Sequence, residues 1–595
     1  MEFKKTRWLI SSKRADFYGI AEKFGIDPVI ARIIRNRDII DEKEYESYIN
    51  PKVKNIPDEA LLKDMNLAVD IILDYIKNNK HIRIIGDYDT DGTCATYILY
   101  RGLKELNAVV DFYIPDRITD GYGLNADIVK KSKADNVDLI ITCDNGISAI
   151  DEIDLSVELG MNVIVTDHHQ LRYIEDENGN REYILPKALA VINPHRYDDD
   201  YPFKMICGAF IAFKLIKRLF EVKTHISNLL EDELKYFAAI ATVGDIMPLI
   251  YENRIFVKNA LHTFSNCKNT GLITLCNNLN LNLNNMSAYN IGFRISPVIN
   301  ASGRLSTAKT VLNLFIEKNP ENTSFLANEL ISLNEERKRM TEKETKNATE
   351  IVLKMDNKYK VIVIFLEECH ESIVGIVAGR IKESFNRPVF VVTKTKDGML
   401  KGSGRSIDKY NMFEEITKVK DILVHYGGHK MAAGFSLTEE KFDEFRERLN
   451  QNTTLTYEDL VDDVVLDLRL PLYYLSLNFV EQLSLLEPFG MGNKKPLFAE
   501  KDVEILSIRK IGKENQYMKL RLNNTKNGFI NALLFNNVDK LENLITEKYG
   551  KTCFDNLISG NREEVKISFI YYPVINEYQG NRDVEIIIND FIVSH

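Results

Sequence analysis

Short apolar runs separated by helix-compatible stretches dominate the first half of the chain. The runs lie at 82–86, 109–114, 138–143 and 162–166, after a segment at 62–80 with helical spacing of its apolar residues. Within each run the apolarity is largely continuous rather than alternating, as parallel strands covered on both faces require. The pattern therefore predicts a doubly wound α/β domain built on a parallel sheet.

The second half of the chain shows three further patterns. Residues 320–356 contain no glycine, and no proline after the first position, and their apolar residues fall near a helical stripe, which predicts one long connecting helix. A second α/β pattern starts at 360–365 and continues with a strand at 389–393. Beyond residue 460, short β-like runs predict an antiparallel barrel; they lie at 502–508, 517–522, 529–535, 565–572 and 584–592.

At 595 residues the chain is too long for a single core, which rarely grows beyond about 250–300 residues. The predicted fold class is multidomain α/β with a C-terminal β-barrel. The expected parts are an N-terminal helical lead-in (1–50), a first α/β domain (51–319), a connecting helix (320–356), a second α/β domain (357–460) and the barrel (461–595).

Composition narrows the class of protein. A net charge of −10 argues against a uniformly basic nucleic-acid coat, although it leaves room for a local basic channel. No window of about 18 uninterrupted apolar residues predicts a membrane span, and the N-terminus does not read as a signal peptide. The seven scattered cysteines form no C-x-x-C pair, which favours free thiols in a reducing cytoplasm.

Acidic and histidine residues follow several of the predicted strands. In parallel α/β folds ligands gather at the carboxyl ends of strands, and crowded carboxylates repel one another unless a cation holds them. A single Asp before a helix is usually only a helix cap, but convergence of all these groups on one sheet edge favours a metal site. The residues are Asp87, Asp89 and Asp91 after the first strand, Asp144 after the third, Asp167, His168 and His169 after the fourth, and Asp245 after a helix.

These motifs resemble a known family. Asp87–Asp91, Asp144–Gly146, Asp167–His169 and Gly244–Asp245 look like the four signature motifs of the DHH phosphoesterase superfamily, in the family's order. More narrowly, the chain resembles the RecJ-like group of bacterial single-strand-specific 5′→3′ exonucleases. Supporting motifs are Pro115–Arg117, Gly121–Gly123, Asn193–His195, Cys207–Ala209 and Ile299–Arg304.

The resemblance implies what each part does. The first domain would be the DHH phosphoesterase domain, the second the DHH-associated domain that grips the nucleic-acid strand, and the barrel an OB-like domain. Among the barrel aromatics we expect most to fill the interior and two or three to stack on bases. The candidates are Phe498, Tyr517, Phe529, Phe535, Tyr571, Tyr572 and Tyr578.

Hydrolysis of a phosphodiester by two divalent ions needs one bridging carboxylate, and Asp144, which stands alone on its strand end, is our choice. By resemblance, Asp89 and Asp91 would reach different ions, and His168 with Asp245 would complete the second. Mixed carboxylate and imidazole ligands suit Mn²⁺ well and Mg²⁺ less exclusively. The other acids and histidine have open roles: Asp87 ligates or orients, His169 contacts the scissile phosphate or supports its neighbours, and Asp167 supports the ligands from behind.

An exonuclease must also recognise a strand end. Two glycine-rich basic stretches, 401–406 and 425–430, are expected as loops whose backbone N–H groups approach an anion. By resemblance, the residues that hold DNA and its 5′-phosphate would be Arg117, Arg304, Ser403, Arg405 and His429. Arg304 has a plainer alternative, a structural ion pair. Selectivity for single strands would come from a channel too narrow for duplex DNA.

Three functions are compatible with the sequence. The leading hypothesis is a metal-dependent 5′→3′ single-stranded-DNA exonuclease in recombination and repair, acting as a monomer with single-strand-binding protein and a DNA helicase as partners implied by the family. The second is a DHH-type oligoribonuclease or cyclic-dinucleotide phosphodiesterase, which the barrel and connector disfavour. The third is a non-catalytic replication scaffold, disfavoured because every acid of the motifs is in place.

Overall fold

The computed structural model describes residues 1–117, 119–121, 123–175, 180–223, 228–396, 398–524 and 528–594. Tyr122, the middle residue of the motif Gly121–Gly123, lies outside the described residues. The chain folds into two compact units. The first comprises Met1–Lys5, Lys52–Val461 and Gly490–Gly492, and the second comprises Thr6–Pro51, Asp462–Phe489 and Asn493–His595.

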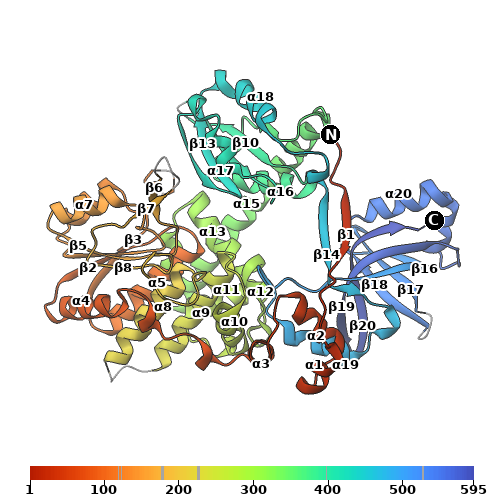
Figure 1. Cartoon of the computed structure of the whole chain (residues 1–595), viewed down its shortest axis with the longest axis horizontal. Helices are drawn as coiled ribbons and strands as arrows, with labels where there is room; N and C mark the ends of the chain where they lie inside the picture. Colours follow the sequence, from red (N-terminus) through yellow and green to blue (C-terminus); the bar gives the residue numbers. More distant parts are fainter. Residues whose placement is uncertain are drawn as a thin grey trace. The chain divides into compact units, whose positions relative to one another are not determined.

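The first unit begins with a parallel sheet of order β3-β2-β4-β5-β8, which confirms the predicted doubly wound fold. Figure 1 labels β2, β3, β5 and β8 of this sheet. Alternate residues of the strands enter different cores: Ile82 and Ile84 pack with α4, α5 and α8, whereas Ile85 and Ile140 pack with α6 and α7. This two-sided burial explains the continuous apolarity of the runs. The strands are β2 (His81–Ile85), β3 (Val109–Tyr113), β4 (Leu139–Cys143), β5 (Asn162–Thr166) and β8 (Ala190–Ile192), and the helices α4 (Met65–Lys77), α5 (Thr90–Glu105), α6 (Ala126–Ala134) and α7 (Ile150–Glu158).

Helices complete this domain. They are α8 (Gly208–Val222), α9 (Asn228–Gly244), α10 (Tyr251–His262), α11 (Thr270–Asn278), α12 (Ala288–Asn290), α13 (Ser296–Leu305) and α14 (Lys309–Ile316), with a hairpin of β6 (Arg172–Glu175) and β7 (Arg181–Ile184). A π-helical turn, η5 (Ile291–Ile295), joins α12 to α13. The predicted connector is confirmed as one helix, α15 (Pro320–Lys354).

The second α/β domain has a mixed sheet of order β12-β13-β11-β10-β9. The two glycine-rich stretches expected as loops are strands, so that prediction was wrong. Gly402 and Gly404 are needed because a Cβ there would lie 2.2 Å from the ring of Phe435 and 2.9 Å from that of Phe390, respectively. The strands are β9 (Ile362–Phe365), β10 (Val389–Lys394), β11 (Leu400–Arg405), β12 (His425–His429) and β13 (Ala432–Leu437), and the helices α16 (Val374–Phe385), α17 (Met412–Thr417) and α18 (Phe442–Asn452).

The second unit is built on a sheet of order β15-β16-β17-β18-β20-β19, in which β16 also pairs with β19, so that five strands close on themselves. The helices of the expected lead-in pack into the same core as these strands. The strands are β1 (Thr6–Ile10), β14 (Asp462–Leu466), β15 (Leu468–Arg469), β16 (Phe498–Ile511), β17 (Tyr517–Asn524), β18 (Gly528–Leu534), β19 (Lys566–Tyr578) and β20 (Asn581–Val593), and the helices α1 (Phe17–Phe24), α2 (Pro28–Asn36), α3 (Glu42–Ile49), α19 (Leu477–Gln482), α20 (Val538–Tyr549) and α21 (Lys551–Ile558).

The barrel aromatics divide into buried and exposed groups. Phe498, Tyr571 and Tyr572 are buried and fill the interior. Tyr517 is half-buried, and its ring lies edge-on to that of Phe535, the residue that follows the neighbouring strand β18, with ring centroids 5.3 Å apart. The exposed side chains are Phe529, Phe535 and Tyr578.

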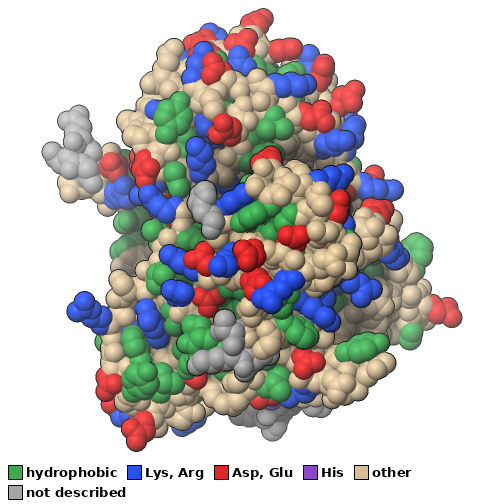
Figure 2. All heavy atoms as spheres, turned by 90° about the vertical axis from the view of Figure 1, so that its right-hand side faces the viewer, with side chains coloured by type: hydrophobic (Ala, Val, Ile, Leu, Met, Phe, Trp, Pro, Cys, Tyr) green, Lys and Arg blue, Asp and Glu red, His purple; other side chains and the backbone are tan. Residues whose placement is uncertain are grey.

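Three general features bear on function. All seven cysteines are free thiols and all are buried. Among the described residues, no helix has the length and apolar character needed to cross a membrane. Figure 2 shows basic and acidic side chains interspersed on one face, with no broad surface of a single sign there.

Candidate metal centre

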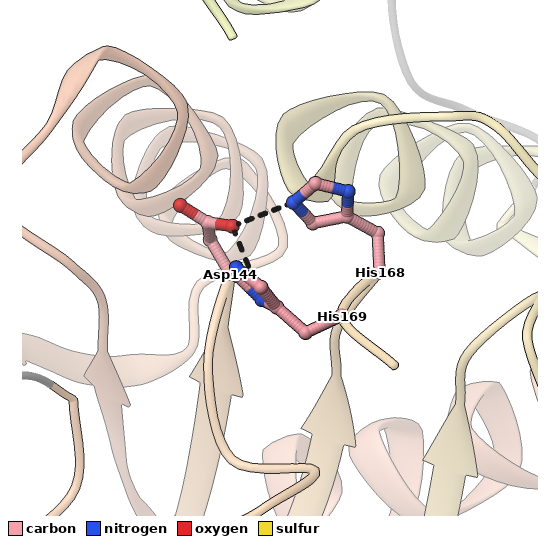
Figure 3. A group of neighbouring side chains, drawn as sticks. All are labelled: Asp144, His168 and His169. Carbon is pink, nitrogen blue, oxygen red and sulfur yellow. Dashed lines mark ion pairs between the residues drawn. The ribbon is translucent and has the colours of Figure 1, made fainter. Parts of the chain in front are cut away.

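The predicted ligands converge at the carboxyl ends of the parallel strands. Asp144 follows β4, and His168 and His169 follow β5, the adjacent strand. Figure 3 shows both imidazole rings directed at the Asp144 carboxylate. The Nε2 atom of His168 lies 3.1 Å from Asp144 Oδ1, and Nδ1 of His169 lies 3.9 Å from the same oxygen.

The carboxylates and imidazoles form three overlapping groups whose ligand atoms lie within 4.8 Å of one another. One group is Asp91, His168 and Asp245, another is Asp87, Asp89 and Asp144, and a third is Asp144 with the two histidines. Asp144 thus belongs to two of the three groups. His168 Nε2 stands 3.5 Å from an oxygen of Asp91 and 3.7 Å from one of Asp245.

Backbone N–H groups fix the first acidic motif in place. Both oxygens of Asp91 accept hydrogen bonds at 2.7 Å, from the N–H groups of Gly208 and Ala209 at the start of α8. Asp89 caps α5 by accepting from the N–H of Gly92 at 3.0 Å. Asp89 is therefore a helix cap, which is the alternative role that the sequence suggested for a single Asp before a helix. It also belongs to the possible metal-binding group with Asp87 and Asp144.

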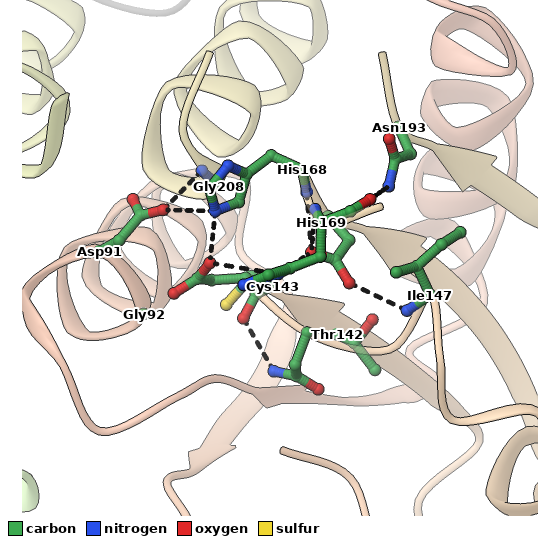
Figure 4. A network of polar contacts seen from close by, with 12 residues as sticks. Asp91, Gly92, Thr142, Cys143, Ile147, His168, His169, Asn193 and Gly208 are labelled. Carbon is green, nitrogen blue, oxygen red and sulfur yellow. Dashed lines mark hydrogen bonds and ion pairs between the residues drawn. The ribbon is translucent and has the colours of Figure 1, made fainter. Parts of the chain in front are cut away.

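Asp167 supports both histidines from behind. Figure 4 shows the network of hydrogen bonds and ion pairs around His168 and His169. It accepts from the N–H of His168 at 2.7 Å, from the N–H and Nδ1 of His169 at 3.1 and 2.7 Å, and from the N–H of Ile147 at 2.9 Å. The two neighbouring imidazoles and these hydrogen bonds hold the pKa of Asp167 at about 2 despite burial, and the pKa of His169 rises to about 9 through Asp167.

Electrostatics show that the site needs positive charge. Burial and, after it, the neighbouring carboxylates raise the pKa of Asp87 and of Asp144 well above the ordinary value, and that of Asp245 to about 9. Within the described chain, Asp87 Oδ1 is buried without a hydrogen-bond partner. Oxygen and imidazole donors in this crowded arrangement fit divalent ions such as Mn²⁺ and Mg²⁺.

Asp144 holds its position through an unusual backbone conformation. Its φ of 60° lies in the left-handed region, which aspartate and asparagine adopt more readily than other residues with a Cβ. A Cβ on Gly208 would lie 2.8 Å from that of Asp144. The close approach of α8 to the end of β4 therefore requires glycine at position 208.

The predicted DNA-binding arginines also lie together. Burial, together with Arg117, Arg337 and Arg405, lowers the pKa of Arg304 to about 10. Arg304 donates a hydrogen bond to the carbonyl of Ser372 at 2.7 Å. The sequence had left open that Arg304 forms a structural ion pair, but within the part of the chain described it forms none.

The second domain presents the rest of this cluster. Arg405 donates to Ser403 Oγ at 3.0 Å, and both side chains lie within 3.0 Å of the Cβ that Gly375 lacks, in the first turn of α16. Arg405 also contributes to lowering the pKa of the exposed His429, after burial. The guanidinium carbon of Arg117 lies 5.2 Å from the centre of the ring of Tyr88, a residue of the first acidic motif.

Sequence reasoning missed some supporting residues. Asn300 accepts from the N–H of Thr90 at 2.8 Å and thereby fixes the first acidic motif to α13. Gly208, Ala209 and Asn300 lie in the motifs Cys207–Ala209 and Ile299–Arg304, which the sequence analysis identified. Their hydrogen bonds to the first acidic motif could not be predicted from the sequence. Ser372, whose carbonyl accepts from Arg304, gave no signal.

Three family patterns match consecutive parts of the chain. The DHH family N-terminal domain matches residues 81–242, the DHHA1 domain matches 358–454, and the RecJ OB domain matches 466–590.

Named relatives match nearly the whole chain. The single-stranded-DNA-specific exonuclease RecJ of Bacillus subtilis is 32% identical over 99% of this chain and 71% of its own length. That of Salmonella typhimurium is 30% identical over 95% of this chain and 96% of its own. The crystal structure of Thermus thermophilus RecJ with Mn²⁺ has a TM-score of 0.81 at 28% identity, covering 99% of this chain and 80% of that one, and its Mg²⁺ complex has a TM-score of 0.75.

Proposed function

The chain belongs to the RecJ family of single-stranded-DNA-specific exonucleases, and we propose that it releases nucleotides from the 5′ end of a single strand with the help of two divalent ions. The coarser activity, metal-dependent exonucleolytic hydrolysis of single-stranded DNA, follows from membership in this family. The single observation that carries the two-ion proposal is that Asp144 belongs to two donor groups at once, one with Asp87 and Asp89 and one with His168, which in turn joins Asp91 and Asp245 in the third group.

We assign the ligands accordingly. Asp91, His168 and Asp245 would hold one ion, Asp87 and Asp89 the other, and Asp144 would bridge them. A bound pair of divalent ions supplies a hydroxide-like nucleophile near neutral pH and neutralises charge on the leaving oxygen. The mixed oxygen and nitrogen donors favour Mn²⁺, with Mg²⁺ as the alternative.

The chain's own residues position the substrate around these ions. Asp167 orients His168 through the backbone and His169 through its ring. The His169 side chain is 44% exposed, and its Nδ1 lies 2.7 Å from Asp167 Oδ1, which fixes the orientation of the ring. We therefore assign to His169 a hydrogen bond to an oxygen of the scissile phosphate, and to Asp167 the positioning of both rings.

Recognition of the 5′-phosphate would fall to the arginine cluster. Arg117, Arg304 and Arg405 lie near one another, and their mutual repulsion favours an anion between them. Ser403 and His429 add a hydroxyl and an imidazole from the second domain. Arginine suits this task because its guanidinium matches the geometry of phosphate oxygens.

The closed five-strand sheet binds single-stranded DNA, and we assign stacking on bases to the exposed side chains of Phe529 and Phe535. Arg521 lies 4.7 Å from the centre of the Phe529 ring and adds positive charge to this face. We further propose that the protein acts as a cytoplasmic monomer with single-strand-binding protein and a helicase, in recombination and repair.

Digestion of end-labelled strands tests the proposal. With Mn²⁺ and a 5′-phosphorylated single strand, a 5′ label should appear first in mononucleotides, and a 3′ label should stay on progressively shorter fragments. Chelation by EDTA and the variant Asp144→Asn should each abolish release, and blunt duplex should be resistant. Early release of the 3′ label would refute the polarity, and metal-dependent cleavage by Asp144→Asn would refute the bridging role.

A further inference from the structure

An uninterrupted helical segment runs from Ala288 to Leu305 and ends at the metal centre. It comprises α12, η5 and α13. Near its carboxyl end, Asn300 accepts hydrogen bonds from the N–H and the hydroxyl of Thr90 at 2.8 and 3.1 Å. Thr90 lies between Asp89 and Asp91, so this end of the segment is fixed to the first acidic motif.

The other end carries an exposed aromatic pair. Tyr289 and Phe293 are 64% and 67% exposed, and their rings stack with centroids 4.8 Å apart and planes inclined by 28°. The adjacent Gly292 packs on α9, where a Cβ would lie 3.5 Å from Val243, two residues before Asp245. The pair therefore lies close to the acidic motif that ends α9.

The aromatic pair and the site residues share one face of the segment. Positions 289, 293, 297, 300 and 304 recur at intervals of four, four, three and four residues, which is the spacing of a single helix face. None of these five side chains is buried, whereas Ile291, Ile295, Val298 and Ile299 are buried on the opposite side. One stripe, exposed at Tyr289 and Phe293 and partly buried at Pro297, Asn300 and Arg304, thus leads to the metal centre.

The π-helical turn lies within this stripe, and Pro297 accounts for it. Proline has no N–H to donate to the carbonyl of Phe293, and its ring clashes with the carbonyl four residues earlier. The chain widens instead, and the N–H of Ser296 bonds to the carbonyl of Ile291, five residues earlier. Such turns occur frequently at functional sites.

We propose that Tyr289 and Phe293 form a stacking platform for bases of the single strand that enters the metal centre. The proposal rests on the exonuclease function above and deepens it. At about 1.5 Å per residue, Phe293 and Tyr289 lie about 16 and 22 Å along the axis from Arg304. At the ~3.4 Å spacing of a stacked strand, this corresponds to at most about seven nucleotides from the end that is cleaved.

A nucleic-acid strand fits this surface better than a protein partner does. Stable protein interfaces bury about 800 Å² on each side, whereas the apolar part of the stripe consists of two aromatic rings and the partly buried Pro297. The same stripe also contains the polar residues Asn300 and Arg304. These two residues lie at the metal centre, where the end of the strand must bind. Stacking on aromatic rings is tolerant of sequence, as digestion of any strand requires.

Steady-state kinetics of the double variant Tyr289→Ala/Phe293→Ala test the proposal. For a 5′-phosphorylated 20-nucleotide strand we expect KM to rise about 5- to 100-fold, the range for loss of base stacking, with kcat changed less than about twofold. A trinucleotide, which spans only about 10 Å when stacked, should be hydrolysed as before. Phe293→Trp should retain the low KM, and Tyr18→Ala, which removes a 79% exposed tyrosine on α1, should have no effect.

An unchanged KM for the 20-nucleotide strand in the double variant would overturn the proposal and point to a protein partner for the pair. Equal losses on the long and short substrates would also overturn it, because they would indicate damage to the metal centre. In an Asp144→Asn background, 2-aminopurine placed three to seven nucleotides from the 5′ end should be quenched on binding, and the double variant should abolish this quenching. Failure of the exonuclease function itself would appear separately, as absence of Mn²⁺-dependent cleavage by the unmodified chain.

Discussion

Replacement of Asp144 by asparagine should stabilise the metal-free protein while abolishing its activity. The Asp144 side chain is 3% exposed, and burial with four neighbouring carboxylates raises its pKa well above the ordinary value. In the absence of metal, folding at neutral pH must therefore either bury a charge or take up a proton. Asparagine removes this cost, keeps the side-chain shape and tolerates the φ of 60°.

The size of the effect has a ceiling. Taking up one proton at pH 7.5 by a group with an unfolded pKa of about 3.9 costs at most about 5 kcal/mol, at 1.36 kcal/mol per unit. The neighbouring acids share this cost, so we expect a gain of about 1–3 kcal/mol, or about 2–10 °C in the first unfolding transition. Because the folded pKa of Asp144 is raised, the native state binds more protons than the unfolded state, and the stability of the metal-free wild type falls as pH rises above about 4.

Thermal unfolding in EDTA between pH 4.5 and 8 measures this gain. The advantage of Asp144→Asn should grow with pH and vanish near pH 4. Saturating Mn²⁺ should stabilise the wild type by about 2.7 kcal/mol at one hundred times Kd, and the variant much less. Asp127→Asn, which changes a side chain that is 95% exposed, is the control. A metal-free variant that melts at or below the wild-type temperature at pH 7.5 would refute the reasoning.

Other substitutions probe the surroundings of the centre. Arg405→Ala should reduce the preference for 5′-phosphorylated over 5′-hydroxyl ends about 10- to 100-fold in kcat/KM; an unchanged ratio would exclude its role. Asp167→Asn should weaken Mn²⁺ binding about 10- to 100-fold, because it loosens both histidines, and a metal titration that matches the wild type would argue against this. Gly303→Ala should abolish activity with the fold retained, because its Cβ would lie 2.5 Å from the carbonyl oxygen of Tyr88; circular dichroism and cleavage assays check this, with the open position Gly379→Ala as control.

The sequence predicted the first sheet and its edge well because both depend on local patterns. Two-sided burial requires continuous apolar runs, so the ends of β2, β4 and β5 could be located to within a residue or two. The acids and histidines that follow these strands then had to meet. The roles of the individual ligands remain predictions, as do the domain boundaries.

Features that depend on distant contacts could not be predicted. Lys401–Ser406 reads as a loop by its glycines, yet the rings of Phe390 and Phe435 select glycine within a strand. Residues 1–50 read as a helical lead-in, but the helices formed by residues 17–49 within it pack their apolar faces against strands more than 400 positions away. Asn300 has no local feature that marks it as the acceptor for Thr90.

The burial of every thiol has a practical use. Since Cys94, Cys143, Cys207, Cys267, Cys276, Cys369 and Cys553 are all inaccessible, a maleimide dye should react only with a cysteine introduced at the surface. Placing one at Tyr457 and one at Tyr578, both well exposed, would put a donor and an acceptor fluorophore on the two units without removing any native cysteine. Energy transfer between them would then report how the units move while a strand is being shortened.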